Sequence, residues 1–262
     1  MSDLSNLLQS IWTLEDTDND WESIKEQREL MELPEFTGGV NPGDQRAIYY
    51  LTRGFQLNNI LEIGTHLGCS TTHLALGIKD NPNGKITTVD IRDVNDVDTN
   101  HTDSEVPHDF NGKNFSVFKS KYTPKKCLEL IGLEDKVEFV KSDSVEFMKN
   151  TKEKYDLVFL DGNHDYDVVM REVPEALNIL NPNGMVLLHD YFPECKPLWP
   201  KSSNVVCTGP YIGVQQLQQQ GLKFFVEPCG NMPWETKYPN EYATSLAVGV
   251  RYEQNIVHNN IW

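Results

Sequence analysis

The chain has 262 residues, a formal net charge of −16 and a hydrophobic content of 39%. This length and composition are typical of one globular domain of ordinary size. The excess of acidic side chains argues against binding to duplex nucleic acid, which requires a basic surface, and against docking on anionic membranes. No apolar run approaches the ~20 residues that a membrane helix needs, so we expect no membrane span.

The N-terminal segment and the cysteines indicate the cellular compartment in which we expect the protein. The segment lacks the basic region of a secretory signal peptide and carries Asp3 early. The five cysteines are scattered and form no C-x-x-C pair, which disfavours a disulfide framework or a zinc site. We therefore expect reduced thiols and a cytoplasmic protein.

Residues 3–32 are predicted to be helical in two pieces, separated by an acidic, turn-prone stretch over 15–20. Apolar side chains recur at helical spacing in the first piece and would form one packed face. We expect residues 1–35 to form a helical cap before the main domain, residues 36–262. A homodimer through these helices is a further expectation.

The main domain alternates predicted helices and strands. The helices are expected at 45–54, with Asp44 as N-cap, and at 70–78, 122–132, 144–150, 166–180 and 209–221. The strands are expected at 60–63, 86–91, 137–143, 155–161, 185–190, 222–228 and 244–252. The alternation predicts an α/β fold with a doubly wound, mostly parallel sheet. The last two strands have no clear helix between them, which predicts a hairpin and one antiparallel edge strand.

Two connections stand out in this pattern. The tetrapeptide NPNG at 181–184 is predicted to be a turn. The stretch 92–115 is rich in Asp, Asn and His, has no apolar period and follows a strand. A long polar loop of this kind is usually a lid, a binding loop or disordered, so we expect it near a ligand site.

The sequence ILEIGTHLGCST at 60–71 predicts a buried strand, a glycine turn and the start of a helix. This is the layout of a ligand-cradling turn at a helix N-terminus. A dinucleotide fingerprint would require glycines where His66 and Cys69 stand, which disfavours a nicotinamide dehydrogenase. The pattern E-x-G-x-x-x-G-x-S resembles the first motif of class I S-adenosylmethionine (SAM) methyltransferases. That resemblance implies their seven-stranded, Rossmann-like fold and SAM as the cofactor.

Five successive strands are predicted to end in acids, and ligands of an open α/β sheet bind at that edge. Each acid alone is also a possible helix N-cap. Because unpaired buried carboxylates are costly, the full set points to a ligand site. The five acids are Glu62, Asp90, Asp143, Asp161 and Asp190.

The roles of these residues toward SAM follow from their chemistry and match the class I motifs. Asp90 suits the two ribose hydroxyls, and Asp143 suits the adenine edge. Asp161 would accept from the methionine amine, while the glycine turn would donate to the methionine carboxylate. The expected cofactor-binding residues are Glu62, Gly64, Thr65, Gly68, Ser70, Asp90, Asp143, Ser144 and Asp161.

The segments FLDGNHDY (159–166) and LLHDY (187–191) resemble those of catechol-type O-methyltransferases and, more closely, of the macrocin O-methyltransferase and cephalosporin-hydroxylase-like group. The resemblance makes Asp161 and Asp190 candidate magnesium ligands. His189 stands where the macrocin group has an acid and is a third candidate ligand. His164 occupies the position of the catalytic base and, with Asp161, is the expected catalytic pair.

The predicted function is SAM-dependent O-methyl transfer to a hydroxyl of a small molecule or sugar, with magnesium as a candidate assisting ion. Two alternatives share the SAM pocket. An aminopropyl transferase would place acids near a polyamine. A non-catalytic SAM-binding module would keep Gly64 and Asp90 but tolerate loss of His164 and Asp190.

Overall fold

The computed structural model describes residues 3–13, 17–33, 40–96, 120–199 and 206–252. Within these residues one seven-stranded sheet has the order β3-β2-β1-β4-β5-β7-β6. Its five N-terminal strands are parallel to one another, and β7 is antiparallel to both of its neighbours. The strands are β1 (Asn59–Ile63), β2 (Lys85–Asp90), β3 (Val137–Lys141), β4 (Tyr155–Leu160), β5 (Leu180–Leu188), β6 (Phe224–Pro228) and β7 (Ala247–Arg251).

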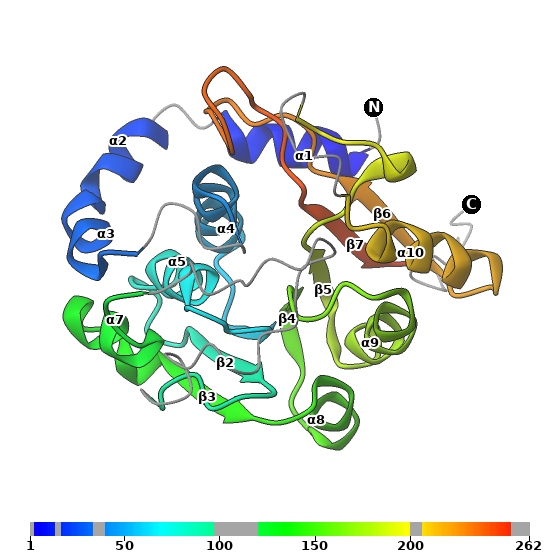
Figure 1. Cartoon of the computed structure of the whole chain (residues 1–262), viewed down its shortest axis with the longest axis horizontal. Helices are drawn as coiled ribbons and strands as arrows, with labels where there is room; N and C mark the ends of the chain where they lie inside the picture. Colours follow the sequence, from blue (N-terminus) through cyan, green and yellow to red (C-terminus); the bar gives the residue numbers. More distant parts are fainter. Residues whose placement is uncertain (1–2, 14–16, 34–39, 97–119, 200–205, 253–262) are drawn as a thin grey trace, which may run out of the picture.

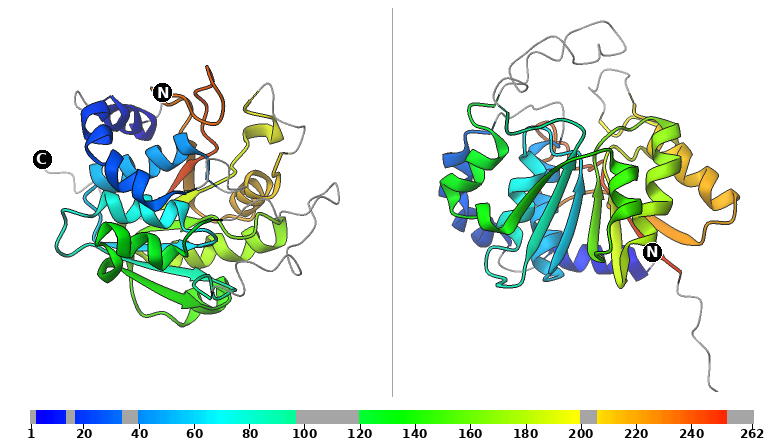
Figure 2. Two further views of the ribbon diagram at one scale, coloured as in Figure 1. Left: turned by 60° about the vertical axis from the view of Figure 1, so that its left-hand side comes forward. Right: turned by 90° about the horizontal axis from the view of Figure 1, so that it is seen from below.

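Helices cover both faces of the sheet (Figures 1 and 2). One face carries α4 (Pro42–Gly54), α5 (Cys69–Gly77) and α7 (Pro124–Ile131), and the other carries α8 (Ser144–Asn150), α9 (Tyr166–Asn178) and α10 (Gly209–Gln219). The N-terminal helices α1 (Asp3–Trp12), α2 (Thr17–Ser23) and α3 (Lys25–Met31) add an outer layer, in which α1 contacts α4 and α3 contacts α7. Short 3₁₀ helices lie at Glu134–Lys136 and Pro193–Cys195.

The strand order reverses at the centre of the sheet, where β1 pairs with β2 on one side and with β4 on the other. In an open α/β sheet this reversal leaves a crevice beyond the carboxyl ends of the two central strands. The predicted doubly wound α/β fold with seven strands is confirmed. The predicted hairpin is confirmed as well, and its antiparallel strand β7 lies one position in from the edge strand β6.

Three local predictions differ from the structure. Asn41, not Asp44, caps α4, because its side chain accepts from the backbone N–H groups of Gly43 and Asp44. The acidic stretch expected to break the N-terminal region instead starts α2 at Thr17. Acidic side chains in a first turn favour a helix N-terminus, which explains the difference.

The third difference concerns the predicted turn at 181–184, which lies inside β5. Leu180 pairs with Tyr155, and regular pairing resumes where Met185 meets Leu157, so the tetrapeptide is an irregularity between two paired positions. The side chain of Asn181 donates to Asp156 of β4 at 2.6 Å, which ties the irregular segment to the sheet. Most of the predicted polar loop at 92–115 lies outside the described residues.

The N-terminal helices share a hydrophobic core with the main domain. Their buried side chains Leu8, Trp12, Ile24 and Met31 belong to the same cluster as Ile48 of α4. A boundary at residue 35 therefore remains a prediction about sequence organisation, because packing runs across it. Among the described helices, none combines the length and apolar character that crossing a membrane requires.

Candidate active site

The central glycine turn is fixed by close approaches within the protein. Gly64 has φ +95°, and a Cβ there would lie 2.3 Å from the backbone oxygen of Asp161. Gly68 has φ +78°, and a Cβ there would lie 2.7 Å from Cβ of Pro124. The backbone N–H of Gly64 donates to the carbonyl of Val89 at 2.8 Å. Glycine is thus required to bring the ends of β1, β2 and β4 together.

A buried polar network supports this turn from beneath. The carboxylate of Glu62 accepts from the hydroxyls of Thr71 at 2.5 Å and Thr88 at 2.6 Å. The Thr65 hydroxyl lies 2.6 Å from that of Thr88 and so points into the network. Burial raises the pKa of Glu62 to about 7. The side chains of Glu62 and Thr65 therefore stabilise the turn through this buried network, and Ser70 is buried as well.

Asp90 connects the glycine turn to the end of β2. Its two carboxylate oxygens accept from the backbone N–H groups of His66 at 3.0 Å and Arg92 at 2.9 Å. His66 has φ +47°, a left-handed conformation that few non-glycine residues adopt. The helix α5 follows the turn, and no side chain caps its N-terminus.

Asp143 is exposed and acts as the N-cap of α8, where it accepts from the backbone N–H of Glu146 at 2.9 Å. The neighbouring Ser144 hydroxyl donates to Glu172 of α9 at 2.5 Å. Glu172 is buried, and burial raises its pKa to about 6. Sequence reasoning missed Glu172, although an acid on the apolar face of α9, beside Val169 and Val173, was the available signal.

The carboxyl ends of β4 and β5 bring two carboxylates and two imidazoles together. His189 Nδ1 lies 2.7 Å from Asp161 Oδ1 and 3.8 Å from Asp190 Oδ1. His164 Nε2 lies 3.5 Å from Asp161 Oδ1 and 3.6 Å from Asp190 Oδ2. The structure thus gathers the four residues that the sequence nominated for proton transfer and metal binding. Among the described side chains, Asp161, His164 and His189 meet the geometric requirement for a shared metal ion, with one donor atom each within 4.8 Å of the others.

Charge and burial compete within this cluster. Burial alone would lower the pKa of His189, but the carboxylates of Asp161 and Asp190 raise it well above its ordinary value. The same balance raises the pKa of His164, chiefly through Asp161. Burial would raise the pKa of Asp161, yet the two imidazoles hold it well below its usual range. The arrangement therefore favours proton transfer between imidazole and carboxylate groups, or the binding of a cation.

Asp44 approaches this cluster from α4 and was expected only as a helix cap. It is fully buried, and its Oδ2 lies 3.7 Å from His189 Nε2. That oxygen also accepts from Asn41 Nδ2 at 2.8 Å and from the Ser245 hydroxyl at 3.2 Å. No sequence signal links Asp44 to a histidine so far along the chain, because only the tertiary fold brings α4 close to the residue that follows β5.

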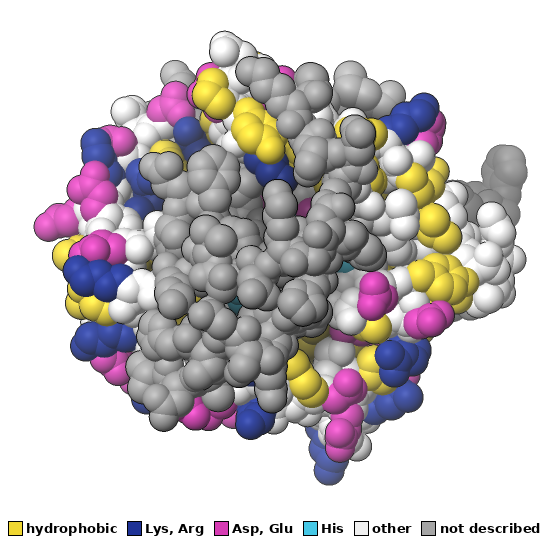
Figure 3. Space-filling model, in the orientation of Figure 1, with side chains coloured by type: hydrophobic (Ala, Val, Ile, Leu, Met, Phe, Trp, Pro, Cys, Tyr) yellow, Lys and Arg dark blue, Asp and Glu magenta, His cyan; other side chains and the backbone are white. Residues whose placement is uncertain are grey.

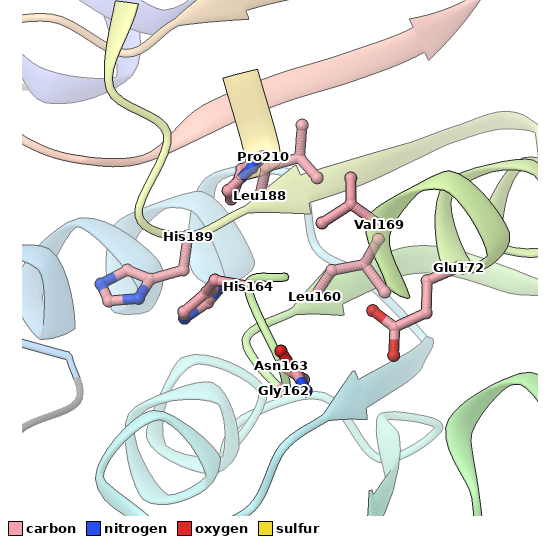
Figure 4. A pocket seen from close by; sticks show the side chains of 9 residues that line it. All are labelled: Leu160, Gly162, Asn163, His164, Val169, Glu172, Leu188, His189 and Pro210. Carbon is pink, nitrogen blue, oxygen red and sulfur yellow. The ribbon is translucent and has the colours of Figure 1, made fainter. Parts of the chain in front are cut away.

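A small pocket opens beside the cluster (Figure 4). The rings of His164 and His189 lie next to each other on one side of it, with centroids 6.0 Å apart, and Glu172 lies across the pocket beyond Leu160 and Val169. Gly209, at the start of α10, closes against the loop that carries His164, since a Cβ there would lie 1.9 Å from the His164 carbonyl oxygen. The pocket is therefore walled by apolar side chains and has polar groups at both ends.

Comparison with known proteins adds family information. A family model described as a methyltransferase domain matches residues 61–191, half of the chain, and includes both the glycine turn and the histidine–carboxylate cluster. A comparison with curated proteins gave no match.

Three solved structures illustrate the fold similarity. Cofactor-bound Rv0187 from MTB is 17% identical, with a TM-score of 0.55 and coverage of 95% of this chain and 96% of that one. An O-methyltransferase from Bacillus cereus in complex with SAH is 16% identical, with a TM-score of 0.54 and coverage of 95% and 97%. The O-methyltransferase TomG from Streptomyces achromogenes, involved in tomaymycin synthesis and in complex with SAM, is 17% identical, with a TM-score of 0.53 and coverage of 91% and 90%.

The similarity to these structures concerns the fold, and the family match covers the segments that carry the glycine turn and the two strand-end motifs. The fold, the turn and the family match agree with the resemblance found in the sequence. The chain belongs to the methyltransferase-domain family and is a class I SAM-dependent methyltransferase.

Proposed function

We propose that this methyltransferase acts on oxygen and transfers the methyl group of SAM to a hydroxyl of a small molecule or a sugar. The observation that supports this most directly is the position of His164, whose Nε2 lies 3.5 Å from Asp161 and 3.6 Å from Asp190. An imidazole between two carboxylates is well suited to accept a hydroxyl proton, because the charge that it gains is stabilised there. The proteins from Bacillus cereus and Streptomyces achromogenes that share this fold are O-methyltransferases.

SAM would supply a methyl group attached to a positively charged sulfur, which leaves as a neutral thioether. The start of α5, which no side chain caps, is suited to its carboxylate, because the positive end of the helix dipole attracts anions. In the proposal Gly64, Thr65, Gly68 and Ser70 contribute through this turn, with Glu62 beneath it. Asp90 would hold the ribose hydroxyls, and Asp143 with Ser144 would face the adenine.

His164 would take the proton of the acceptor hydroxyl as the oxygen attacks the methyl carbon. Asp161 would hold His164 in place and accept from the amine of SAM. A positioned general base typically contributes about 10²–10⁴-fold to a rate. The apolar walls of the pocket would exclude water from the reacting groups, which strengthens these electrostatic contacts.

Magnesium assistance was predicted from Asp161, Asp190 and His189. Mg²⁺ prefers an octahedron of oxygen ligands and usually retains several waters. The donors that converge in the structure are two imidazole nitrogens and the carboxylates of Asp161 and Asp190, and a set with two nitrogen donors does not fit an ion that prefers oxygen alone. The proposal therefore routes no step through magnesium.

A cytoplasmic location and a homodimer are further parts of the proposal. The five cysteines, all of them among the described residues, form no disulfide, which is the pattern of a protein in a reducing compartment. The dimer rests only on the expected helical arm, and light scattering would test it.

The variant His164→Ala tests the proposed function. We expect it to bind S-adenosylhomocysteine like the wild type in calorimetric titration, because the proposal gives His164 no direct contact with the cofactor. Turnover on a panel of hydroxyl acceptors should fall by about 10²-fold or more, since the proton acceptor is lost.

Asp165→Asn is the matched control, because Asp165 is exposed, neighbours His164 and makes no side-chain cap hydrogen bond. We expect it to keep both binding and turnover. Equal turnover in His164→Ala and the wild type would remove the base assignment. Failure of the wild type to bind S-adenosylhomocysteine would contradict the assigned cofactor site.

A further inference from the structure

We propose that His164, His189 and Asp161 form a binding site for a borderline first-row metal ion of the Zn²⁺ or Co²⁺ type. The three donor atoms lie within 4.8 Å of one another. His189 Nδ1 and Asp161 Oδ1 are 2.7 Å apart, and His164 Nε2 is 3.5 Å from the same oxygen. Two ligands bound at about 2.1 Å lie about 3.0 Å apart at a right angle and about 3.4 Å apart at the tetrahedral angle. The two distances to Asp161 Oδ1 bracket that range, and the two imidazole donor atoms lie within 4.8 Å of each other, so side-chain adjustment would complete the site.

His189 provides an independent reason to expect a ligand. Its side chain is only 3% exposed, and neither ring nitrogen is aligned for a hydrogen bond with a described residue, although Nδ1 lies 2.7 Å from Asp161 Oδ1 and Nε2 lies 3.7 Å from Asp44 Oδ2. The 2.7 Å approach to Asp161 therefore lacks the alignment of a hydrogen bond. A buried polar atom without an aligned hydrogen bond destabilises the folded protein. A metal ion that accepts the Nδ1 lone pair beside the carboxylate would satisfy both groups.

The chemistry of the donors selects the class of ion. Imidazole nitrogen suits Zn²⁺, Co²⁺ and Ni²⁺, whereas Mg²⁺ and Ca²⁺ prefer sites built from oxygen alone. Asp190 lies next to both imidazoles, at 3.6 Å from His164 Nε2 and 3.8 Å from His189 Nδ1, and adds negative charge to the site. The replacement of oxygen ligands by nitrogen thus shifts the preference away from magnesium.

Asp44 has a defined part in this site as an orienting group. Its Oδ2 faces Nε2 of His189 at 3.7 Å, on the side of the ring opposite the donor nitrogen. Asn41 and Ser245 donate to that oxygen and fix the carboxylate in place. A carboxylate in this position favours the tautomer with the proton on Nε2, which leaves the Nδ1 lone pair for the ion. Loss of such an orienting group typically weakens metal binding by about 10–100-fold.

One consequence rests on the proposed function. A metal ion at Nε2 of His164 occupies the lone pair that the proposed base needs for the acceptor proton. The ion-bound protein should therefore methylate more slowly than the metal-free protein, and a chelator should restore the rate. In this view the site gives the enzyme a means of inhibition by a metal ion.

The test is calorimetric titration of the full chain with ZnCl₂ and, separately, with MgCl₂, at about pH 8, where protons compete less with the metal ion for the imidazoles than they do at neutral pH. We expect one Zn²⁺ per chain at micromolar affinity or tighter and no Mg²⁺ binding in the same range. His189→Ala and His164→Ala should each weaken Zn²⁺ binding at least 100-fold. Asp44→Asn should weaken it by about 10–100-fold.

Cys207→Ser is the matched control, because Cys207 is the thiol near the cluster, with Sγ 3.4 Å from Asp190 Oδ2. It should bind Zn²⁺ like the wild type, and Co²⁺ spectra should lack a thiolate charge-transfer band. S-adenosylhomocysteine titration checks that each variant is folded. If His189→Ala does not fold, the partly exposed His164 carries the test through His164→Ala.

Equal affinity for Mg²⁺ and Zn²⁺, unchanged Zn²⁺ binding in both histidine variants, or no Zn²⁺ binding by the wild type would each overturn the proposed site. Faster turnover with Zn²⁺ would overturn the inhibition. Zn²⁺ binding by a protein that methylates no hydroxyl acceptor would leave the metal site standing and remove the proposed function. Methylation without Zn²⁺ binding would do the reverse.

Discussion

Gly64 is the residue at which the fold and the site depend on the same backbone conformation. A side chain there would have to adopt φ +95° and would place its Cβ 2.3 Å from the carbonyl oxygen of Asp161. We expect Gly64→Ala to lower the free energy of unfolding by about 3 kcal/mol or more, because backbone strain and a collision add. Chemical denaturation would measure the loss, and S-adenosylhomocysteine titration should show weaker binding.

Gly132 provides the control for that substitution. It also has a positive φ, +69°, but a Cβ there would meet no atom within 4 Å. Gly132→Ala should therefore cost only the backbone strain, about 1 kcal/mol. If both variants lowered the free energy of unfolding by the same amount, the collision of the new Cβ with the end of β4 would make no contribution to the loss.

Glu62 should make stability depend on pH. Burial raises its pKa in the folded protein to about 7, whereas an unfolded glutamate titrates near ~4.3. Between these values the folded state holds a proton that the unfolded state has released, so stability falls as the pH rises. Glu62→Gln removes this contribution, and its free energy of unfolding relative to the wild type should rise by about 2 kcal/mol between pH 5 and pH 7.5. Denaturation curves at the two pH values would show this, and a constant difference would contradict it.

At the level of residues, the sequence predicted what lies at strand ends and missed what packing alone assembles. Asp161, His164, His189 and Asp190 follow two neighbouring parallel strands, so the shared edge of the sheet brings them together. Glu172 reaches Ser144 from a different helix, and Asp44 reaches His189 from α4. Neither contact follows from spacing along the chain.

Among the structural elements, α2 and α3 depend on one aromatic side chain. The Trp21 ring lies under the Arg28 guanidinium at 4.0 Å and packs against Tyr49 of α4 at 5.5 Å and His73 of α5 at 5.8 Å between centroids. We expect Trp21→Ala to lower the free energy of unfolding by about 2 kcal/mol, since a half-buried ring loses its packing. Hydrogen exchange should accelerate mainly in α2 and α3.

Leu30 is the control for that variant, because it lies on the neighbouring helix α3 and its side chain is 46% exposed. Leu30→Ala should change stability by less than about 0.5 kcal/mol. Uniformly faster exchange across the sheet in Trp21→Ala would show that Trp21 supports the whole fold and does not act locally.

Helices and strands were predictable where the hydrophobic periodicity and the alternation of helices with strands were strong. Their boundaries were predicted wrongly where a local turn or cap signal competed with strand pairing or with another cap. The Asn-Pro-Asn-Gly sequence indicates a turn, yet Leu180 before it pairs with Tyr155 and draws the segment into β5. Aspartate is a good N-cap, so the sequence predicts Asp44 as the cap of α4. Asn41 instead stands directly before Pro42, and proline favours the first helical position. In the folded protein Asp44 instead lies next to His189.

For the whole molecule, the distribution of charged and apolar side chains on the surface is relevant to whether two chains form a homodimer. Acidic and basic side chains are interspersed around the described part of the face in Figure 3. Leu7 and Leu30, 45% and 46% exposed, are the large hydrophobic side chains of α1–α3 that remain exposed among the described residues. The apolar face expected to form a dimer is therefore largely used within the chain, and the homodimer remains a prediction for light scattering to test.

The N-terminal helices α1–α3 and the main domain are expected to unfold together as one cooperative unit. Removal of residues 1–33 would take Leu8, Trp12, Ile24 and Met31 out of the core, each at most 2% exposed. Full burial of such a side chain contributes about 1.5–3 kcal/mol, so the four together approach the total stability of about 5–15 kcal/mol that a domain of this kind has. We expect the truncated chain to lack a cooperative thermal transition by circular dichroism, whereas the full chain unfolds in one step. A truncated chain that melts cooperatively at the same temperature and binds S-adenosylhomocysteine would instead make the N-terminal helices a separate unit, with the boundary at residue 35.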